Sequence, residues 1–445
     1  TYESRFTMTE YEAKFSGRGK NINYVKVIPR REKEDAMILA RENGRTIPKE
    51  DRNFGISSRA KAMIATEGKD KVINATIGSL LDDNGDLIVL SSVDKVFKTL
   101  EPAEYADYAP ITGMPSFKEA VKKAAFGSYE PKGFVEVAAT PGGTGSLRNS
   151  VANYSEPGDT IMTTDWHWGP YKTIAGEIGR KVATFDLFDA ERKFNIASFK
   201  DVASKLIAEQ NSLVIILNTP AHNPTGYSLT LEDWDNLVAV LTELAQTGKA
   251  IALVVDTAYI DFAGDEDEYR QFLPKLETMP ENVLPLIAYS LSKTFTLYGT
   301  RCGALICMAK TQEIADEFKK VSEFSSRGSW SNTAKLSQVI MSKIYADPEL
   351  LASVSEERAY YRDMLIARGR AFEEEAQKVG LEIVPFDAGF FASVPCDDPE
   401  AAYEKLAQQG AFLIPLAKGL RIAVAAISEE KCRRLPAMIK AAIEG

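Results

Sequence analysis

The fold can be predicted from residues 213–256, which read LVIILNTPAHNPTGYSLTLEDWDNLVAVLTELAQTGKAIALVVD. Two continuous apolar runs of strand length, LVIIL and IALVV, flank a longer segment whose apolar residues recur at helical spacing. Thr230 is a typical helix N-cap, Asp233 lies in the first turn, and Gly248 is a typical helix stop. Strand, helix and strand in this order predict a βαβ unit with two parallel strands.

The same alternation continues through most of the chain. Further short, β-rich runs read VEVAAT, TIMTT, KVATFDL, LIAYS and GALICMA, and amphipathic helices are expected at SSVDKVFKTLE and MPSFKEAVKKAAFG. Continuous apolar strands that alternate with amphipathic helices predict an α/β fold, with a mostly parallel sheet covered on both faces. Ligands bind such sheets at the carboxyl ends of the strands, so the residues that follow each run are candidates for a site.

A second domain is expected, because 445 residues exceed what one ordinary core accommodates. After Asn332 the pattern changes to long helices and two strand-like segments, FFASVP and LRIAVAAI, with a last helix after Ser428. The expected parts are an amino-terminal arm of residues 1–52, a large ligand-binding domain of residues 91–349, and a smaller α+β domain of residues 53–90 and 350–445.

Composition narrows the class of protein. With 45% hydrophobic and 26% charged residues the chain is typical of soluble globular proteins. Its net charge of −10 disfavours nucleic acid as a partner, which needs a basic face. The longest apolar runs are too short to cross a bilayer, and no signal peptide is evident at the start, so we expect a cytoplasmic protein without a membrane partner.

Metal and histidine chemistry are poorly supported. The four cysteines show no CxxC spacing, so neither a zinc site nor a disulfide framework is indicated. There are two histidines, His167 and His222, which disfavours a metal site built from histidine and a histidine-dependent triad. We therefore expect no bound metal, and another group must move protons.

Two strand ends suggest a phosphate site. After VEVAAT comes PGGTGSLRNS, in which three glycines and Thr144 lead into an expected helix, so that backbone N–H groups gather at its positive end. The segment is neither a P-loop nor a GxGxxG motif, and a plain strand-helix turn explains it equally well. After LIAY come Ser290, Lys293 and Arg301, and hydroxyls with a guanidinium suit a phosphate dianion.

The same strand ends carry groups for covalent chemistry. A lysine beside other cations loses part of its preference for the ammonium form, so Lys293 is suited to form a Schiff base with an aldehyde. Asp256 follows an apolar run and is either a helix N-cap or the partner of a protonated ring nitrogen. Asn223 lies in HNPTG, which is either a plain turn or a source of an amide donor. Pyridoxal 5′-phosphate (PLP) has the phosphate, ring nitrogen, ring oxygen and aldehyde that these groups require.

The segments TPGGTGSLR, HNPTG, DTAY and SLSKTFTLYGTRCGAL, in this order, resemble the class I, fold-type I PLP-dependent aminotransferases. The resemblance runs from about Gly55 to the carboxyl end and is strongest to the aspartate and aromatic aminotransferase branch. It implies a large domain with a mostly parallel seven-stranded sheet between helices, a smaller α+β domain, and a homodimer with shared active sites.

The resemblance also implies a set of cofactor-binding and catalytic residues. Lys293 is expected to form the internal aldimine, and Asp256 and Tyr259 complete the catalytic group. The implied cofactor-binding residues are Gly143, Thr144, Trp168, Asn223, Asp256, Tyr259, Ser290, Ser292, Lys293 and Arg301, together with Tyr108, which reaches the phosphate of the neighbouring subunit. A second tryptophan, Trp166, precedes Trp168 by two residues, and Tyr171 stands where the family often has a histidine that supports the aspartate.

Substrate residues are implied in the same way. They are Gly78, Trp168, Asn223, Arg327, Phe391 and Arg421. Arg421 is expected to bind the α-carboxylate bidentately, and Arg327 to bind a side-chain carboxylate across the dimer interface. For Arg327 a solvated helix-end arginine is the alternative. Two arginines at a fixed separation select a dicarboxylic acid.

The expected function follows from these residues. It is a ping-pong transaminase that moves the amino group of a dicarboxylic amino acid, in the first place aspartate, to 2-oxoglutarate. An aromatic amino acid aminotransferase is the nearest alternative. A PLP-dependent β-lyase or decarboxylase on the same fold is a further one, because the bond that breaks depends on substrate orientation.

Overall fold

The computed structural model describes residues 52–445, with side chains described from Phe54 onward. The predicted amino-terminal arm lies outside the described residues, apart from Arg52, which begins helix α1 (Arg52–Glu67). Among the described residues, no helix is long and apolar enough to cross a membrane, and no group of three or more His, Cys, Asp or Glu side chains is arranged to hold a metal ion.

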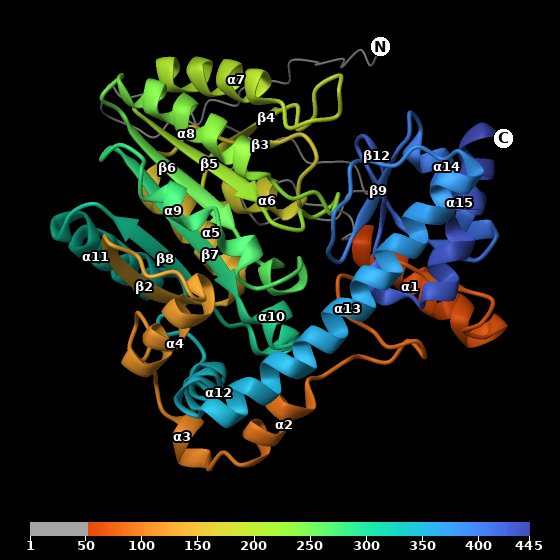
Figure 1. Ribbon diagram of the computed structural model, residues 1–445, viewed down its shortest axis with the longest axis horizontal. Helices are drawn as coiled ribbons and strands as arrows, with labels where there is room; N and C mark the ends of the chain where they lie inside the picture. The colour runs from red at the N-terminus through yellow and green to blue at the C-terminus, as the bar shows by residue number, and fades with distance from the viewer. Residues whose placement is uncertain (1–51) are drawn as a thin grey trace, which may run out of the picture. The chain divides into compact units, whose positions relative to one another are not determined.

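The central sheet has seven strands in the order β2-β8-β7-β6-β5-β3-β4 (Figure 1). They are β2 (Phe134–Thr140), β3 (Thr160–Thr164), β4 (Lys181–Phe185), β5 (Ser212–Asn218), β6 (Ala250–Asp256), β7 (Val283–Ser290) and β8 (Gly303–Ala309). Only β8 runs antiparallel to its neighbours, β2 and β7. Each strand matches one of the apolar runs in the sequence, so the predicted mostly parallel sheet is confirmed.

Helices cover both faces of this sheet (Figure 1). The helices of this part of the chain are α4 (Pro115–Phe126), α5 (Gly142–Tyr154), α6 (Pro170–Glu177), α7 (Ile196–Glu209), α8 (Leu231–Ala245), α9 (Leu273–Leu276), α10 (Leu291–Thr294), α11 (Gln312–Ser329) and α12 (Lys335–Ala346). Two more, α2 (Ser91–Lys98) and α3 (Pro102–Ala106), pack against α12 instead of the sheet. Successive residues of a strand enter opposite cores: in β5, Val214 and Ile216 pack with α5, α6 and α11, whereas Leu213 and Ile215 pack with α7 and α8. Strands β5, β6, β7 and β8 are largely apolar because both of their faces are buried, whereas the edge strand β4 is only partly buried.

A separate hydrophobic cluster joins residues from the two ends of the described chain. Its elements are α1, β1 (Ile73–Asn74), α13 (Pro348–Val379), β9 (Ala392–Pro395), α14 (Pro399–Gln408), β10 (Ala411–Phe412), β11 (Ile414–Leu416), β12 (Gly419–Ile422) and α15 (Glu429–Glu444). On this basis we propose the division into a large and a small domain. The segment LRIAVAAI is a strand only as far as Ile422, because the next amide, of Ala423, donates to the Ala75 carbonyl (2.9 Å) instead of continuing the ladder.

The strand ends bring the sequence motifs together. In the sheet, Asn218 at the end of β5 is in register with Asp256 at the end of β6, and Ser290 at the end of β7 faces Gly303 at the start of β8. Strand β2 also ends at this edge, because Thr140 pairs with the same Gly303. The loops that follow β2, β5, β6 and β7 therefore surround one region.

Candidate active site

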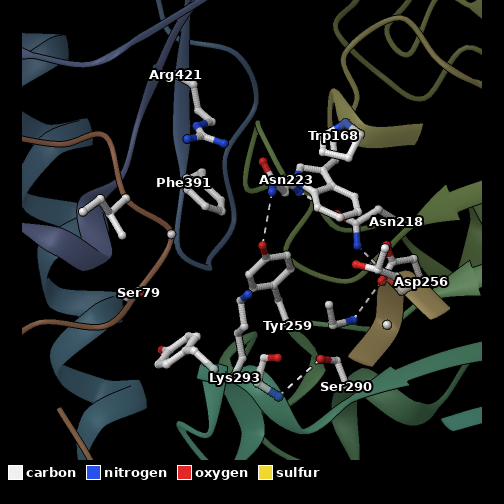
Figure 2. A pocket seen from close by; sticks show the side chains of 18 of the residues that line it. Ser79, Trp168, Asn218, Asn223, Asp256, Tyr259, Ser290, Lys293, Phe391 and Arg421 are labelled. Atoms are coloured by element: carbon white, nitrogen blue, oxygen red, sulfur yellow. Dashed lines mark hydrogen bonds between the residues drawn. The ribbon is translucent and has the colours of Figure 1, made fainter. Parts of the chain in front are cut away.

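A cavity of about 460 Å³ lies at this edge of the sheet (Figure 2). The predicted site residues that line it are Gly78, Gly143, Thr144, Trp168, Asn223, Asp256, Tyr259, Ser290, Ser292, Lys293, Arg301, Phe391 and Arg421. They come from segments more than 300 residues apart in the chain, from the loop after β1 to β12.

One end of the cavity gathers donors for an anion. Helix α5 begins directly after β2, and no side chain caps its first turn, so its amide groups remain available at the positive end of the helix dipole. The Arg301 Nη1 donates to Ser292 Oγ (3.2 Å) and to the Tyr298 carbonyl (2.9 Å). Gly142 has φ 67°, and a Cβ there would lie 2.6 Å from Arg301 Nη2. The glycine thus lets the guanidinium approach the helix end.

Lys293 lies in the short helix α10 and is half-buried. Its Nζ lies 5.5 Å from the ring centroid of Tyr259 and 5.3 Å from that of Tyr298. Burial lowers the pKa of Lys293 from 10.5 to about 8; Arg301 and Arg421 also lower it, and Asp256 opposes them. A lysine with this pKa is partly neutral near physiological pH, as a nucleophilic amine requires.

Asp256 is buried at the end of β6 and accepts two hydrogen bonds. Tyr171 Oη donates to Oδ2 (2.7 Å), and the Ala258 amide donates to Oδ1 (3.2 Å). Burial raises the pKa of Asp256, whereas both hydrogen bonds and the charge of Lys293 lower it. The carboxylate is thus desolvated but supported on both oxygens.

A chain of amides connects Asp256 to Tyr259. Asn218 Nδ2 donates to the backbone carbonyl of Asp256 (2.7 Å), and Asn218 Oδ1 accepts from the backbone N–H of Asn223 (2.6 Å). Asn223 Nδ2 donates to Tyr259 Oη (3.1 Å), as Figure 2 shows, while Asn223 Oδ1 is buried without a hydrogen-bond partner. Burial raises the pKa of the Tyr259 phenol above its usual value of 10.0, so the hydroxyl keeps its proton.

Arg421 lies in β12 on another wall of the cavity. Its Cζ is 4.4 Å from the ring centroid of Phe391, and its Nη2 donates to the Thr76 carbonyl (2.8 Å). The buried Nε has no hydrogen-bond partner, and burial lowers the pKa of the guanidinium to about 10. Gly78 leaves room for the Phe391 ring, because a Cβ at Gly78 would lie 2.8 Å from Phe391 Cζ. A buried arginine with an unused donor suits a carboxylate ligand.

The structure separates the two tryptophans of the loop after β3. Trp168 lines the cavity. Trp166 is buried in the core instead, where a Cβ at Gly419 would lie 2.9 Å from its Cη2. The aromatic position beside the cofactor is therefore available to Trp168.

Two predicted residues lie outside the cavity. Tyr108 is 82% exposed, and Arg327 is exposed near the end of α11, where its Nη1 donates to Ser331 Oγ (2.8 Å). Both were assigned to the active site of a neighbouring subunit, and that assignment stays a prediction.

Sequence reasoning missed several residues that line the cavity. Asn218 and Tyr298 belong to this group, as do three residues of α1: Phe54, Ser57 and Lys61. Asn218 is the last residue of an apolar strand, so the strand-end rule could have identified it. The α1 residues are spaced by three and four positions and share one helix face, a signal that becomes useful only once the location of α1 is known.

Comparison with known proteins agrees with this geometry. Residues 70–439 match the family described as aminotransferase class I and II. The chain belongs to this family. Because its members depend on PLP, the predicted enzyme class and cofactor are confirmed, and the predicted fold class is confirmed with them.

The aminotransferase is similar to several named relatives. It is 30% identical over 304 residues to the mitochondrial aspartate aminotransferase of Schizosaccharomyces pombe. This match covers 67% of this chain and 66% of the Schizosaccharomyces pombe protein, which is just under two thirds of that protein's length. It is 29% identical over 287 residues to the aromatic-amino-acid aminotransferase of Paracoccus denitrificans, covering 63% of this chain and 70% of that one. A solved aminotransferase from Anaerococcus prevotii is 35% identical, with a TM-score of 0.89, over 92% of this chain and 100% of its own.

The residues of this aminotransferase fit PLP. The uncapped start of α5, Ser290 and Arg301 suit its phosphate, and Asp256 suits its ring nitrogen. Asn223 and Tyr259 line the cavity as a hydrogen-bonded pair, and Asn223 Oδ1 is buried without a partner, so this wall offers polar groups to a bound molecule. Lys293 is the amine that the aldehyde needs.

Proposed function

We propose that this aminotransferase transfers the amino group of a dicarboxylic amino acid, aspartate first, to 2-oxoglutarate in a ping-pong cycle. The observation that carries an α-amino acid as the substrate is Arg421, a buried guanidinium that lines the same cavity as Lys293 and has no hydrogen-bond partner at Nε. The choice of a dicarboxylic donor rests on the role proposed below for Arg327. Both proposed substrates carry a carboxylate next to the reacting carbon, and a buried arginine binds such a group strongly. The named aspartate aminotransferase relative supports the same choice.

Each residue then has a defined task. Bound PLP supplies an electron sink for negative charge that develops at the α-carbon of the substrate. Asp256 holds a proton on the ring nitrogen, and Asn223 with Tyr259 binds the ring oxygen. Lys293, with a pKa of about 8, is the group suited to accept and return the α-proton at its Nζ. Arg421 orients the substrate by its carboxylate.

We further propose that two copies of the chain pair, so that Arg327 of each completes the other's cavity. Phe324 supports an interface here, because it lies one turn before Arg327 on α11 and is 83% exposed. Tyr108, another exposed aromatic residue, is assigned to the same interface. Aromatic side chains are enriched at protein–protein interfaces relative to the rest of a protein surface. In this arrangement Arg327 binds the side-chain carboxylate of the substrate.

A second candidate is an aromatic amino acid aminotransferase. Phe54, Trp168, Tyr298 and Phe391 line the cavity, and aromatic walls accommodate an aromatic side chain. The Paracoccus denitrificans relative carries that name.

An amino-donor panel with 2-oxoglutarate tests the proposal. We expect the wild-type enzyme to have its highest kcat/KM with aspartate. Arg327→Asp should lower kcat/KM about 100-fold with aspartate but less than about tenfold with phenylalanine, because a charge-assisted contact is lost only with the dicarboxylate. Lys61→Met is the matched control, since Lys61 is a cation that lines the cavity of its own chain.

The outcomes separate the alternatives. Equal losses on the two donors reject the role of Arg327, and a selective loss in Lys61→Met transfers that role to the subunit's own helix α1. A higher kcat/KM with phenylalanine than with aspartate favours the aromatic aminotransferase. Release of ammonia or carbon dioxide without formation of glutamate indicates a lyase or a decarboxylase.

A further inference from the structure

Tyr171 is a buried tyrosine beside the cofactor site, where its hydroxyl donates a hydrogen bond to Asp256. It lies in α6, is 1% exposed and is absent from the cavity wall. Its Oη donates to Asp256 Oδ2 at 2.7 Å, while the other carboxylate oxygen accepts from the Ala258 amide. Tyr171 therefore supplies the one side-chain hydrogen bond that the Asp256 carboxylate receives among the described residues.

Packing holds the Tyr171 ring in one orientation. The His167 ring stacks on it, with centroids 6.4 Å apart and planes 11° apart, and the Trp168 ring meets it edge-on at 5.7 Å. Pro170 begins α6 and restricts the backbone just before the tyrosine. The direction of the hydroxyl toward Asp256 is thus set by its neighbours before any ligand binds.

The Tyr171 hydroxyl donates a hydrogen bond and remains protonated. Burial, followed by the charge of Asp256, raises the pKa of the Tyr171 phenol well above its usual value. A phenol that stays neutral has one proton to give, and here that proton points at the carboxylate. Such a bond favours the ionised carboxylate over the protonated one, against the effect of burial.

Neither histidine of the chain donates a hydrogen bond to the Asp256 carboxylate among the described residues. His167 Nδ1 lies against the carbonyls of Thr164 and Asp165, and His222 Nδ1 is 2.7 Å from Thr225 Oγ1. No hydrogen bond joins either ring to Asp256 in the described part of the chain. The support of this carboxylate is built without an imidazole.

We propose that Tyr171 is the positioning residue that keeps Asp256 ionised and directed at the ring nitrogen of PLP. Removal of the hydroxyl leaves a buried carboxylate oxygen without its donor. This favours the protonated carboxyl group, and the ion pair between Asp256 and a protonated ring nitrogen becomes weaker. The proposal rests on PLP binding and not on the choice of amino donor.

The test compares two ligands by their dissociation constants. One is PLP, and the other is its analogue in which carbon replaces the ring nitrogen. Tyr171→Phe should weaken PLP binding about 10- to 100-fold, because a hydrogen bond to a charged group is lost. It should change binding of the analogue less than threefold, since Asp256 has no ring nitrogen to hold there. Tyr154→Phe is the matched control, a tyrosine that packs against the same hydrophobic cluster, and both of its constants should stay within twofold of the wild type.

Equal losses for the two ligands overturn the proposal, because they assign Tyr171 a purely structural role, and unchanged PLP binding overturns it as well. If Tyr171→Phe lacks the wild-type circular dichroism spectrum, the pair Tyr171→His and Tyr171→Leu replaces it, one with an N–H donor and one without. The proposal then requires the leucine variant alone to lose the preference for PLP over the analogue. No amino donor is present in these measurements, so an incorrect substrate assignment does not affect their outcome.

Discussion

Lys293 should destabilise the protein that contains it. Burial keeps the pKa of this lysine at about 8 in the folded chain without cofactor, against an ordinary value of 10.5. The unfolded chain therefore binds a proton at Lys293 that the folded chain binds less tightly. Replacing the lysine by methionine, which has a similar length and no charge, should stabilise the protein without cofactor while it abolishes turnover.

The size of the effect follows from the pKa difference. At 1.36 kcal/mol for each unit, a fall from 10.5 to about 8 costs the folded state about 3 kcal/mol at pH 7. The cost is complete below about pH 8, shrinks as the pH rises from 8 toward 10.5, and disappears above 10.5, where both states carry a neutral amine. The gain in Lys293→Met should therefore be about 3 kcal/mol at pH 7 and about 1 kcal/mol at pH 10.

Thermal unfolding of the protein without cofactor provides the measurement. For a chain of 445 residues a gain of about 3 kcal/mol corresponds to a rise in Tm of about 3 °C, and the rise should fall to about 1 °C at pH 10. The matched control is Lys95→Met on the exposed surface of α2, which should change the free energy of unfolding by less than about 0.5 kcal/mol. A Lys293 variant that is no more stable at pH 7, or whose gain is the same at both pH values, refutes the argument.

Two further predictions concern the framework of the site. Gly142→Ala should weaken PLP binding at least about tenfold, because the new Cβ would lie 2.6 Å from Arg301 Nη2 and the backbone φ is 67°. The control Gly169→Ala, with open space around its Cβ, should leave PLP binding unchanged. Equal PLP affinities of the two variants contradict the assignment of the phosphate site. Asp261→Asn should destabilise the protein by about 3–5 kcal/mol in urea unfolding at pH 7, because Asp261 and Arg270 form an ion pair at 2.7 Å with both side chains buried. The control Asp201→Asn removes an exposed ion pair and should cost less than about 1 kcal/mol. The pKa of Asp261 is lowered to about 2, so this contribution is present above about pH 4 and is lost as the pH falls through 2; a cost that persists unchanged at pH 2 contradicts it.

Local sequence determined the secondary structure around the site. All seven runs became strands of the central sheet, and the runs of β5 to β8 are continuous because a strand buried on both faces must be largely apolar. The capped helix after Thr230 formed as α8 with a capping box, since Thr230 and Asp233 satisfy amides only a few residues away. These patterns depend on neighbours in the chain, so the sequence alone sufficed.

The sequence also indicated the cofactor, because chemistry-bearing residues follow strands whose carboxyl ends share one edge of the sheet. Asp256, Ser290 and Lys293 could be grouped in this way before their positions were known. Asp256 and Ser290 are the last residues of their strands and Lys293 follows three residues later, so strand order and direction alone brought them together.

Tertiary structure alone decided the contacts between distant segments. Tyr171 and Asp256 are 85 positions apart, and their hydrogen bond depends on how α6 packs against the sheet. In the same way, only packing placed Trp168 rather than Trp166 on the cavity wall and brought Lys61 of α1 to it. A pattern in the sequence records the period of its own helix or strand, whereas the partner of a buried polar group is set by side chains from other elements.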